Sequence, residues 1–157
     1  MNRFARSGLA VAPKAIAPKT KVALRTSTIL VAEDNIDSRE MMKVLLRSKG
    51  YGVFEAADGL QAVEVALTKL PDLILLDLQL PLLDGLRVTR NLRQHPKLRA
   101  VPIVVISGYD QNQHRQLSFD AGCNEYLSKP IDFGRLEEML NTFVPLSEGE
   151  VRKKLAV

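Results

Sequence analysis

Short apolar runs alternate with amphipathic stretches along most of the chain. The runs that we expect to form strands lie at residues 28–32, 51–56, 73–76, 103–106 and 125–128. Most of them lack polar alternation, which is typical of strands buried on both faces of a parallel sheet. The third run, Leu-Ile-Leu-Leu, leads directly into Asp77. It therefore predicts a buried strand that holds Asp77 at its carboxyl end.

The stretches between these runs have helical periodicity. We expect helices over residues 37–49, 60–70, 85–94, 110–121 and 132–143. In three of them, residues at helical spacing form a stripe that we expect to face the core. These stripes are Met41, Val44, Leu45 and Ser48; Val63, Ala66, Leu67 and Leu70; and Leu136, Met139, Leu140 and Phe143. A further stripe, which we expect to face solvent rather than a partner, comprises Arg87, Arg90 and Arg93.

Five strands that alternate with five helices predict an α/β fold. Right-handed crossovers place helices on both faces of a five-stranded parallel sheet and bring the carboxyl ends of all strands to one rim. Open sheets of this kind bind ligands in the crevice beyond those carboxyl ends. We expect one domain over residues 28–143, followed by a polar C-terminal tail over residues 144–157.

The composition is that of one globular domain with tails. The chain has 157 residues, of which 46% are hydrophobic and 25% are charged, and this length suffices to bury a core. No apolar run approaches the roughly 20 residues that a membrane-spanning helix needs. The single cysteine, Cys123, excludes an internal disulfide and a multi-cysteine metal site. We therefore expect a cytoplasmic protein without a membrane span.

The net charge of +4 is concentrated near the N-terminus. Residues 1–27 contain six basic residues and no acidic one, which leaves 16 of the 22 basic residues against all 18 acidic residues, a balance of −2. The positive net charge is therefore no evidence for a nucleic-acid-binding domain. The Ala, Pro, Lys and Ser composition of residues 1–27 predicts a flexible basic extension. We favour this over an organelle-targeting peptide, because serines are few and prolines interrupt the segment.

Charged and polar side chains follow four of the five expected strands. Glu33 and Asp34 follow the first strand, Asp77 the third, Ser107 the fourth and Lys129 the fifth. Three carboxylates at one rim repel one another unless a cation lies among them. Mg²⁺ is the preferred ion for such oxygen ligands. The hydroxyl and the ammonium indicate an anionic ligand, such as a phosphoryl group.

These residues belong to short motifs that occur in a fixed order. The motifs are Glu33-Asp34-Asn35, the stretch DLQLPLLDG at residues 77–85, Ser107-Gly108, Tyr126 and Lys129-Pro130. Together they resemble the receiver domains of bacterial two-component response regulators over residues 28–143. The resemblance implies a flavodoxin-like (βα)5 fold with strand order 2-1-3-4-5.

The resemblance also implies roles for the acidic residues. Asp77 would accept a phosphoryl group from a histidine kinase or a histidine phosphotransfer protein and form an aspartyl phosphate. Asp34, Asp77 and the backbone carbonyl of Gln79 would bind Mg²⁺, and Glu33 would assist through a water molecule. The protein would then be a phosphoacceptor module rather than an enzyme that turns over a separate substrate.

Further residues would respond to the phosphoryl group. Lys129 would pair with one of its oxygens, and Ser107 would donate its hydroxyl to another. Tyr126 would change rotamer with the loop after the fourth strand, so that a local change in charge biases a two-state element. Gln79 and Tyr109 flank the path of an attacking water, and we expect them to set the lifetime of the phosphoryl group.

The residues by themselves leave other interpretations open. Glu33 and Asp34 also suit the capping of the first helix. A receiver-like docking module that is not regulated by phosphorylation carries the same motifs. A phosphatase with an aspartyl nucleophile needs a second acid two residues later, where this chain has Gln79. The segment after Phe143 is too short for a DNA-binding domain, so we expect contact with a downstream protein as the output, with no particular oligomeric state predicted.

Overall fold

The computed structural model describes residues 25–109 and 111–156, so the flexible extension expected over residues 1–27 lies almost wholly outside the described residues. The strands are β1 (Thr28–Ala32), β2 (Gly52–Ala56), β3 (Leu73–Asp77), β4 (Ile103–Ser107) and β5 (Glu125–Ser128). The helices are α1 (Ile36–Lys49), α2 (Gly59–Lys69), α3 (Gly85–Gln94), α4 (Gln111–Ala121), α5 (Phe133–Phe143) and α6 (Glu148–Leu155). Within the described part of the chain, no helix is both long enough and apolar enough to cross a bilayer.

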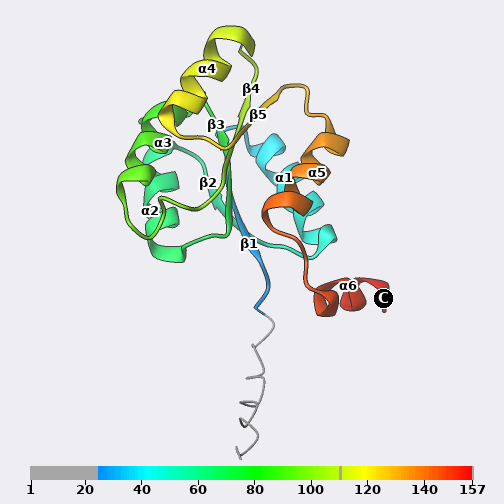
Figure 1. Ribbon diagram of the computed structural model, residues 1–157. Helices are drawn as coiled ribbons and strands as arrows, with labels where there is room; N and C mark the ends of the chain where they lie inside the picture. The colour runs from blue at the N-terminus through cyan, green and yellow to red at the C-terminus, as the bar shows by residue number, and fades with distance from the viewer. Residues whose placement is uncertain (1–24, 110, 157) are drawn as a thin grey trace, which may run out of the picture.

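The strands form one parallel sheet in the order β2-β1-β3-β4-β5. This order confirms the predicted flavodoxin-like topology. Figure 1 shows α2, α3 and α4 on one side of the sheet and α1 and α5 on the other. Because all strands are parallel, their carboxyl ends meet at one rim, which is where ligands bind in folds of this class.

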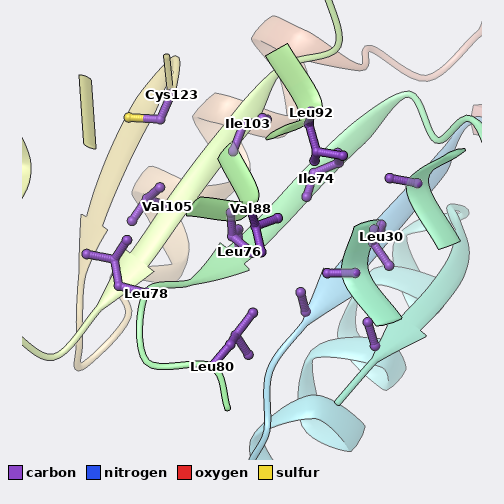
Figure 2. Packing of buried hydrophobic residues seen from close by; sticks show 14 of the residues in the cluster. Leu30, Ile74, Leu76, Leu78, Leu80, Val88, Leu92, Ile103, Val105 and Cys123 are labelled. Carbon is purple, nitrogen blue, oxygen red and sulfur yellow. The ribbon is translucent and has the colours of Figure 1, made fainter. Parts of the chain in front are cut away.

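Both faces of the sheet are buried, because successive side chains of a strand point to opposite faces. In β3, Leu73 and Leu75 pack with α1 and α5, whereas Ile74 and Leu76 pack with α2 and α3. Figure 2 shows the second of these layers, in which Leu76 lies beside Val88 of α3. Each such side chain contributes roughly 1.5–3 kcal/mol through burial. The uninterrupted aliphatic run therefore anchors the strand that ends at Asp77.

The predicted inner face of α1 was mostly wrong, since Leu45 is the only predicted residue of α1 that packs against the core. Its buried residues are Met42 and Leu46, whereas Met41 is 48% exposed and Val44 is 60% exposed. Helix α1 carries two overlapping apolar stripes that differ by one residue position, which is about 100° of rotation on a helix. Packing against the sheet and α5 selects the stripe that contains Met42 and Leu46, and periodicity by itself does not distinguish the two.

The predicted face of α2 was partly wrong for a related reason. Ala62 and Ala66 are fully buried, whereas Leu67 and Leu70 are each 38% exposed. Small side chains on the inner face allow α2 to approach the sheet closely, so larger leucines are displaced to the edge. The prediction for α5 was better, since its buried residues are Leu136, Met139 and Leu140.

Residues 144–157 contain α6, a helix that the sequence analysis did not predict. Ser147 begins it with a capping box: the Ser147 hydroxyl accepts from the Glu150 N–H, and the Glu150 carboxylate accepts from the Ser147 N–H. Val144 is buried, and Leu146 packs against the core between the sheet and α5. The Ser-x-x-Glu spacing is the signal that reveals this helix start in an otherwise polar segment.

Arg93 does not belong to a solvated stripe, contrary to the prediction. Its guanidinium donates hydrogen bonds to the carbonyls of Leu98, Val101 and Gly122 and to the side chain of Asn124. These bonds tie the end of α3 to the turns that precede β4 and β5. They offset the desolvation of a partly buried guanidinium.

Candidate functional site

Three carboxylates meet at the carboxyl ends of two neighbouring strands. Glu33 and Asp34 directly follow β1, and Asp77 is the last residue of β3. Since β1 and β3 are adjacent and parallel, their ends lie side by side. One oxygen from each of the three carboxylates lies within 4.8 Å of the others. We refer to Glu33, Asp34 and Asp77 as the acidic cluster.

Backbone hydrogen bonds hold the acidic cluster in place. The N–H of Glu33 donates to the carbonyl of Ala56 at the end of β2 (3.0 Å). The Glu33 carboxylate accepts from the N–H of Asn35, the N-cap of α1 (3.0 Å). The Asp77 carboxylate accepts from the N–H of Gln79 (2.7 Å). One oxygen of Glu33 and one of Asp77 are therefore fixed by the chain, and the other oxygens face the rest of the site.

Two glycines allow the loop after Asp77 to pack closely. A Cβ on Gly85, at the start of α3, would lie 2.5 Å from the Asp77 carbonyl oxygen. A Cβ on Gly59, at the start of α2, would lie 1.7 Å from the Leu83 carbonyl oxygen. No side chain fits at such distances, so glycine is required at both helix starts. The loop behind Asp77 is thus held between α2 and α3.

Lys129 reaches the acidic cluster from the end of β5. Its ammonium lies 2.5 Å from Asp77 Oδ2 and 2.9 Å from Glu33 Oε2. The Lys129 N–H donates to the carbonyl of Ser107 (2.8 Å), which holds this loop beside the end of β4. The Lys129–Pro130 peptide bond is cis. The structure thus brings together Glu33, Asp34, Asp77 and Lys129, residues that are up to 96 positions apart in the sequence.

Two pKa values are shifted within this group. Burial raises the pKa of Glu33, and the nearby Asp77 charge adds to the rise, against the hydrogen bonds from Lys129 and the Asn35 N–H. Burial alone would lower the pKa of Lys129, but its hydrogen bonds to Asp77 and Glu33 outweigh burial and raise that pKa. Lys129 therefore remains protonated at neutral pH. One ammonium faces three carboxyl groups, so negative charge is in excess.

The acidic cluster has the ligands that suit a hard divalent cation. Carboxylate oxygens are preferred by Mg²⁺, and a cation among them relieves their mutual repulsion. The Asp34 side chain is exposed, and among the described residues its carboxylate has no hydrogen-bond or ion-pair partner. It is therefore free to act as a ligand. The cluster could hold a metal ion.

A cavity of about 310 Å³ opens beside the site. Its lining is mainly apolar and includes Met41, Met42, Ile131 and Phe133, together with Asp77 and Lys129. Asp77 itself is only 4% exposed. The cavity therefore provides a route from solvent to a carboxylate that is otherwise enclosed.

Ser107 ends β4, the strand next to β3, and Tyr126 lies in β5, which pairs with β4 at the edge of the sheet. Ser107 is buried one residue beyond Ile106, which pairs with Asp77 in the sheet, and its hydroxyl accepts from the Tyr109 N–H (3.1 Å). Tyr126 is 1% exposed, and its hydroxyl has no hydrogen-bond partner in the part of the chain that the structure describes. An unpaired buried hydroxyl costs roughly 1–3 kcal/mol. Packing therefore holds Tyr126 in this rotamer against an opposing cost.

A family model described as the response regulator receiver domain matches residues 29–141. The chain belongs to this receiver domain family. Within curated proteins, the Polar-differentiation response regulator DivK of Brucella ovis is 31% identical over 119 residues, which cover 76% of this chain and 97% of that protein.

Solved receiver domains share the fold. The receiver domain of the sensor histidine kinase PA1611 from Pseudomonas aeruginosa PAO1 is 37% identical, with a TM-score of 0.70, over 76% of this chain and 98% of that one. That structure has a magnesium ion coordinated in its active site cleft. The chemotaxis protein CheY4 of Vibrio cholerae is 25% identical, with a TM-score of 0.72, over 76% of this chain and all of that one (100%).

One residue beside the site of this receiver domain was missed by the sequence analysis. The Arg39 guanidinium of α1 donates to the backbone carbonyl of Glu33 (2.8 Å). Arg39 belongs to none of the motifs and lies on the polar side of α1. Its only signal is its place five residues after Asp34, since helical side chains lean back toward the turn that precedes them.

Proposed function

We propose that this receiver domain is a phosphorylation-dependent switch in a two-component pathway. Asp77 attacks the phosphorus atom of a phosphohistidine in a histidine kinase or a histidine phosphotransfer protein. A carboxylate oxygen forms the new O–P bond, the P–N bond breaks, and its electron pair returns to the imidazole. The observation that carries this proposal is that three carboxylates meet at the strand ends and that the Lys129 ammonium contacts two of them.

Asp77 is suited to this role by its position. Its strand is buried on both faces, so the carboxylate is held in one place, and positioning contributes much of the catalysis in phosphoryl transfer. The Gln79 N–H fixes one carboxylate oxygen at 2.7 Å. The cavity beside Asp77 and Lys129 gives the donor a path to the acceptor.

Mg²⁺ is the ion that we propose for the acidic cluster. Asp34, Asp77 and the backbone carbonyl of Gln79 would hold it, and Glu33 would assist through a water molecule. When bound, the ion neutralises negative charge on the phosphoryl oxygens. The magnesium ion in the cleft of the PA1611 receiver domain supports this choice, as does the exposed and unpaired Asp34 carboxylate in this chain.

The neighbouring side chains then respond to the phosphoryl group on Asp77. Lys129 already lies on Asp77 and Glu33, so it pairs with an oxygen of the phosphoryl group. The Ser107 hydroxyl accepts from the Tyr109 N–H and still has its own proton to donate to a second phosphoryl oxygen. Movement of this loop allows Tyr126 to leave a rotamer in which its hydroxyl is unpaired. The changed surface is recognised by a downstream protein in the cytoplasm.

Gln79 and Tyr109 set the lifetime of the aspartyl phosphate in this proposal. Gln79 is exposed and Tyr109 is 42% exposed, so solvent reaches both side chains. Replacing both with alanine is expected to change the rate at which water removes the phosphoryl group. A dephosphorylation rate equal to that of the wild type would contradict this assignment.

Intact-protein mass spectrometry tests the central step. Wild type, Asp77→Asn and the control Asp72→Asn are incubated with acetyl phosphate and Mg²⁺. We expect a labile phosphoryl adduct on the wild type and on Asp72→Asn, because Asp72 lies at the opposite end of β3, and none on Asp77→Asn. Absence of an adduct on the wild type would contradict the proposal in favour of a docking module. Turnover of a phosphate ester would favour a phosphatase.

A further inference from the structure

Arg39 holds the backbone of the loop that carries two of the three carboxylates. Its Nη1 atom donates to the carbonyl oxygen of Glu33 at 2.8 Å and lies 3.4 Å from that of Asp34. The Arg39 side chain is 16% exposed, so it is mostly enclosed. Arg39 therefore holds two successive carbonyls through one nitrogen, with a short hydrogen bond to the first and a longer one to the second.

The other side of the guanidinium is tied to β2. Its Nε atom lies 3.5 Å from the carboxylate of Glu55, whose second oxygen accepts from Lys43 at 3.2 Å. The N–H of Glu33 is bonded to Ala56, the residue after Glu55. Strand β2 therefore fixes the loop twice, once directly at an N–H and once through Arg39 at the carbonyls.

We infer that Arg39 is a positioning residue for Asp34, a proposed metal ligand, and for Glu33, which assists through a water molecule. By holding their carbonyls, it orients both carboxylates toward Asp77 before a cation arrives. This inference rests on the proposed Mg²⁺ site. Residues that orient metal ligands without touching the metal typically change its affinity by 10- to 100-fold.

Positioning and simple electrostatics predict effects of opposite sign. A positive charge near a cation site repels the cation, so if charge alone mattered, removing Arg39 would strengthen Mg²⁺ binding. If Arg39 positions the ligands, removing it weakens Mg²⁺ binding, because the loop then has to be ordered by the ion. The sign of the change therefore separates the two explanations.

The test is a calorimetric titration of the full chain with Mg²⁺. We expect Arg39→Met to bind Mg²⁺ about 10-fold more weakly than the wild type. Arg39→Lys keeps the charge but cannot contact the Glu33 carbonyl and Glu55 together, so we expect a smaller but measurable loss. The matched control is Lys43→Met. Lys43 is a second cation that contacts Glu55, but it does not contact a carbonyl of the loop. We expect Lys43→Met to bind Mg²⁺ at least as tightly as the wild type.

Each outcome has a definite meaning. Unchanged or tighter Mg²⁺ binding by Arg39→Met overturns the inference, and so does an equal loss in Lys43→Met. Thermal unfolding without Mg²⁺ shows whether each variant is folded. If Arg39→Met is not folded, Arg39→Lys is used in its place. Wild-type affinity for Mg²⁺ in Arg39→Lys would then overturn the inference. If the wild type itself binds no Mg²⁺, the proposed metal site fails instead.

Discussion

The two rims of the sheet hold acidic side chains in different ways. At the carboxyl ends of the strands, Glu33 and Asp77 of the acidic cluster share the ammonium of Lys129, and Asp34 has no ion-pair partner among the described residues. At the amino ends, each acidic side chain has partners of its own. We call this second group the basal rim, and it comprises Arg25, Ser27, Thr28, Asp72 and Glu150; Figure 1 shows α6 near the start of β1 at this rim.

Backbone N–H groups satisfy the acids of the basal rim. The Asp72 carboxylate accepts from the N–H of Thr28 (2.8 Å) and from its hydroxyl (3.2 Å). The Glu150 carboxylate accepts from the N–H groups of Ser27 (3.1 Å) and Ser147 (2.7 Å). Charge-assisted bonds of this kind stabilise the folded chain. A cation site therefore requires more carboxylates than there are local donors to pair with them. Acidic residues that each have their own donors, as at the basal rim, have a structural role instead.

The largest difference between the rims is expected in Mg²⁺ affinity. The double variant Glu33→Gln/Asp34→Asn removes two charges from the acidic cluster. If each substitution weakens Mg²⁺ binding by about 10-fold, the double variant should bind about 100-fold more weakly. Asp72→Asn at the basal rim should leave the affinity unchanged. Calorimetric titration measures both. A comparable loss in Asp72→Asn would remove the distinction between the rims.

The next largest effect is on stability at the basal rim. Asp72→Ala leaves the N–H and hydroxyl of Thr28 without their acceptor. We expect the free energy of unfolding to fall by about 1–3 kcal/mol, as measured by urea denaturation, whether or not Mg²⁺ is present. Asp34→Ala is the control, since it removes an exposed carboxylate without a partner among the described residues. An equal loss in the control would contradict the comparison.

A smaller effect is expected where α6 meets the basal rim. Ser147→Ala removes the hydroxyl of the capping box and should cost about 1 kcal/mol. Amide hydrogen exchange should become faster within α6 and remain unchanged in α1. Ser48→Ala, which removes an exposed hydroxyl near the end of α1, is the control. If α6 exchanges at the wild-type rate in Ser147→Ala, the capping box does not stabilise the helix.

The smallest effect is the pH dependence of the acidic cluster without Mg²⁺. The pKa of Glu33 is raised above its ordinary value of 4.5, mainly by burial, so the folded state binds this proton more tightly than the unfolded state does. The contribution of Glu33 to stability is then most favourable at low pH and declines as the pH rises above 4.5 through the folded pKa. Urea denaturation of wild type and Glu33→Gln across this range measures it. We expect the wild type to lose stability relative to the variant as the pH rises, and the opposite slope would contradict the shift.

The parallel sheet could be predicted from the hydrophobic pattern of the sequence, whereas its strand order was implied by the resemblance to receiver domains. Continuous aliphatic runs, such as Leu73–Leu76, are local signals, because a strand buried on both faces has no polar positions to confuse its pattern. The motif order then located the acidic cluster and Lys129 at one rim, since all strands in such a sheet end on the same side. The strands and the shared rim thus follow from the order and period of the apolar runs.

Other features were decided by tertiary contacts. The rotation of α1 that buries Met42 rather than Met41, the clamp formed by Arg93 and the contact of Arg39 with the Glu33 carbonyl all depend on which element lies opposite. A helical pattern states which residues are apolar, but it does not state which of two overlapping stripes faces the sheet. Likewise, the sequence around a charged residue does not indicate which carbonyl the residue will contact.

The amino-acid sequence by itself determined that this chain forms five parallel strands with an acid-bearing rim. Only the tertiary structure decided which acids remain short of donors at that rim and which are satisfied at the opposite one. The physical reason is that hydrophobic period is a property of neighbouring residues, whereas the pairing of a charge depends on groups brought together from distant parts of the chain.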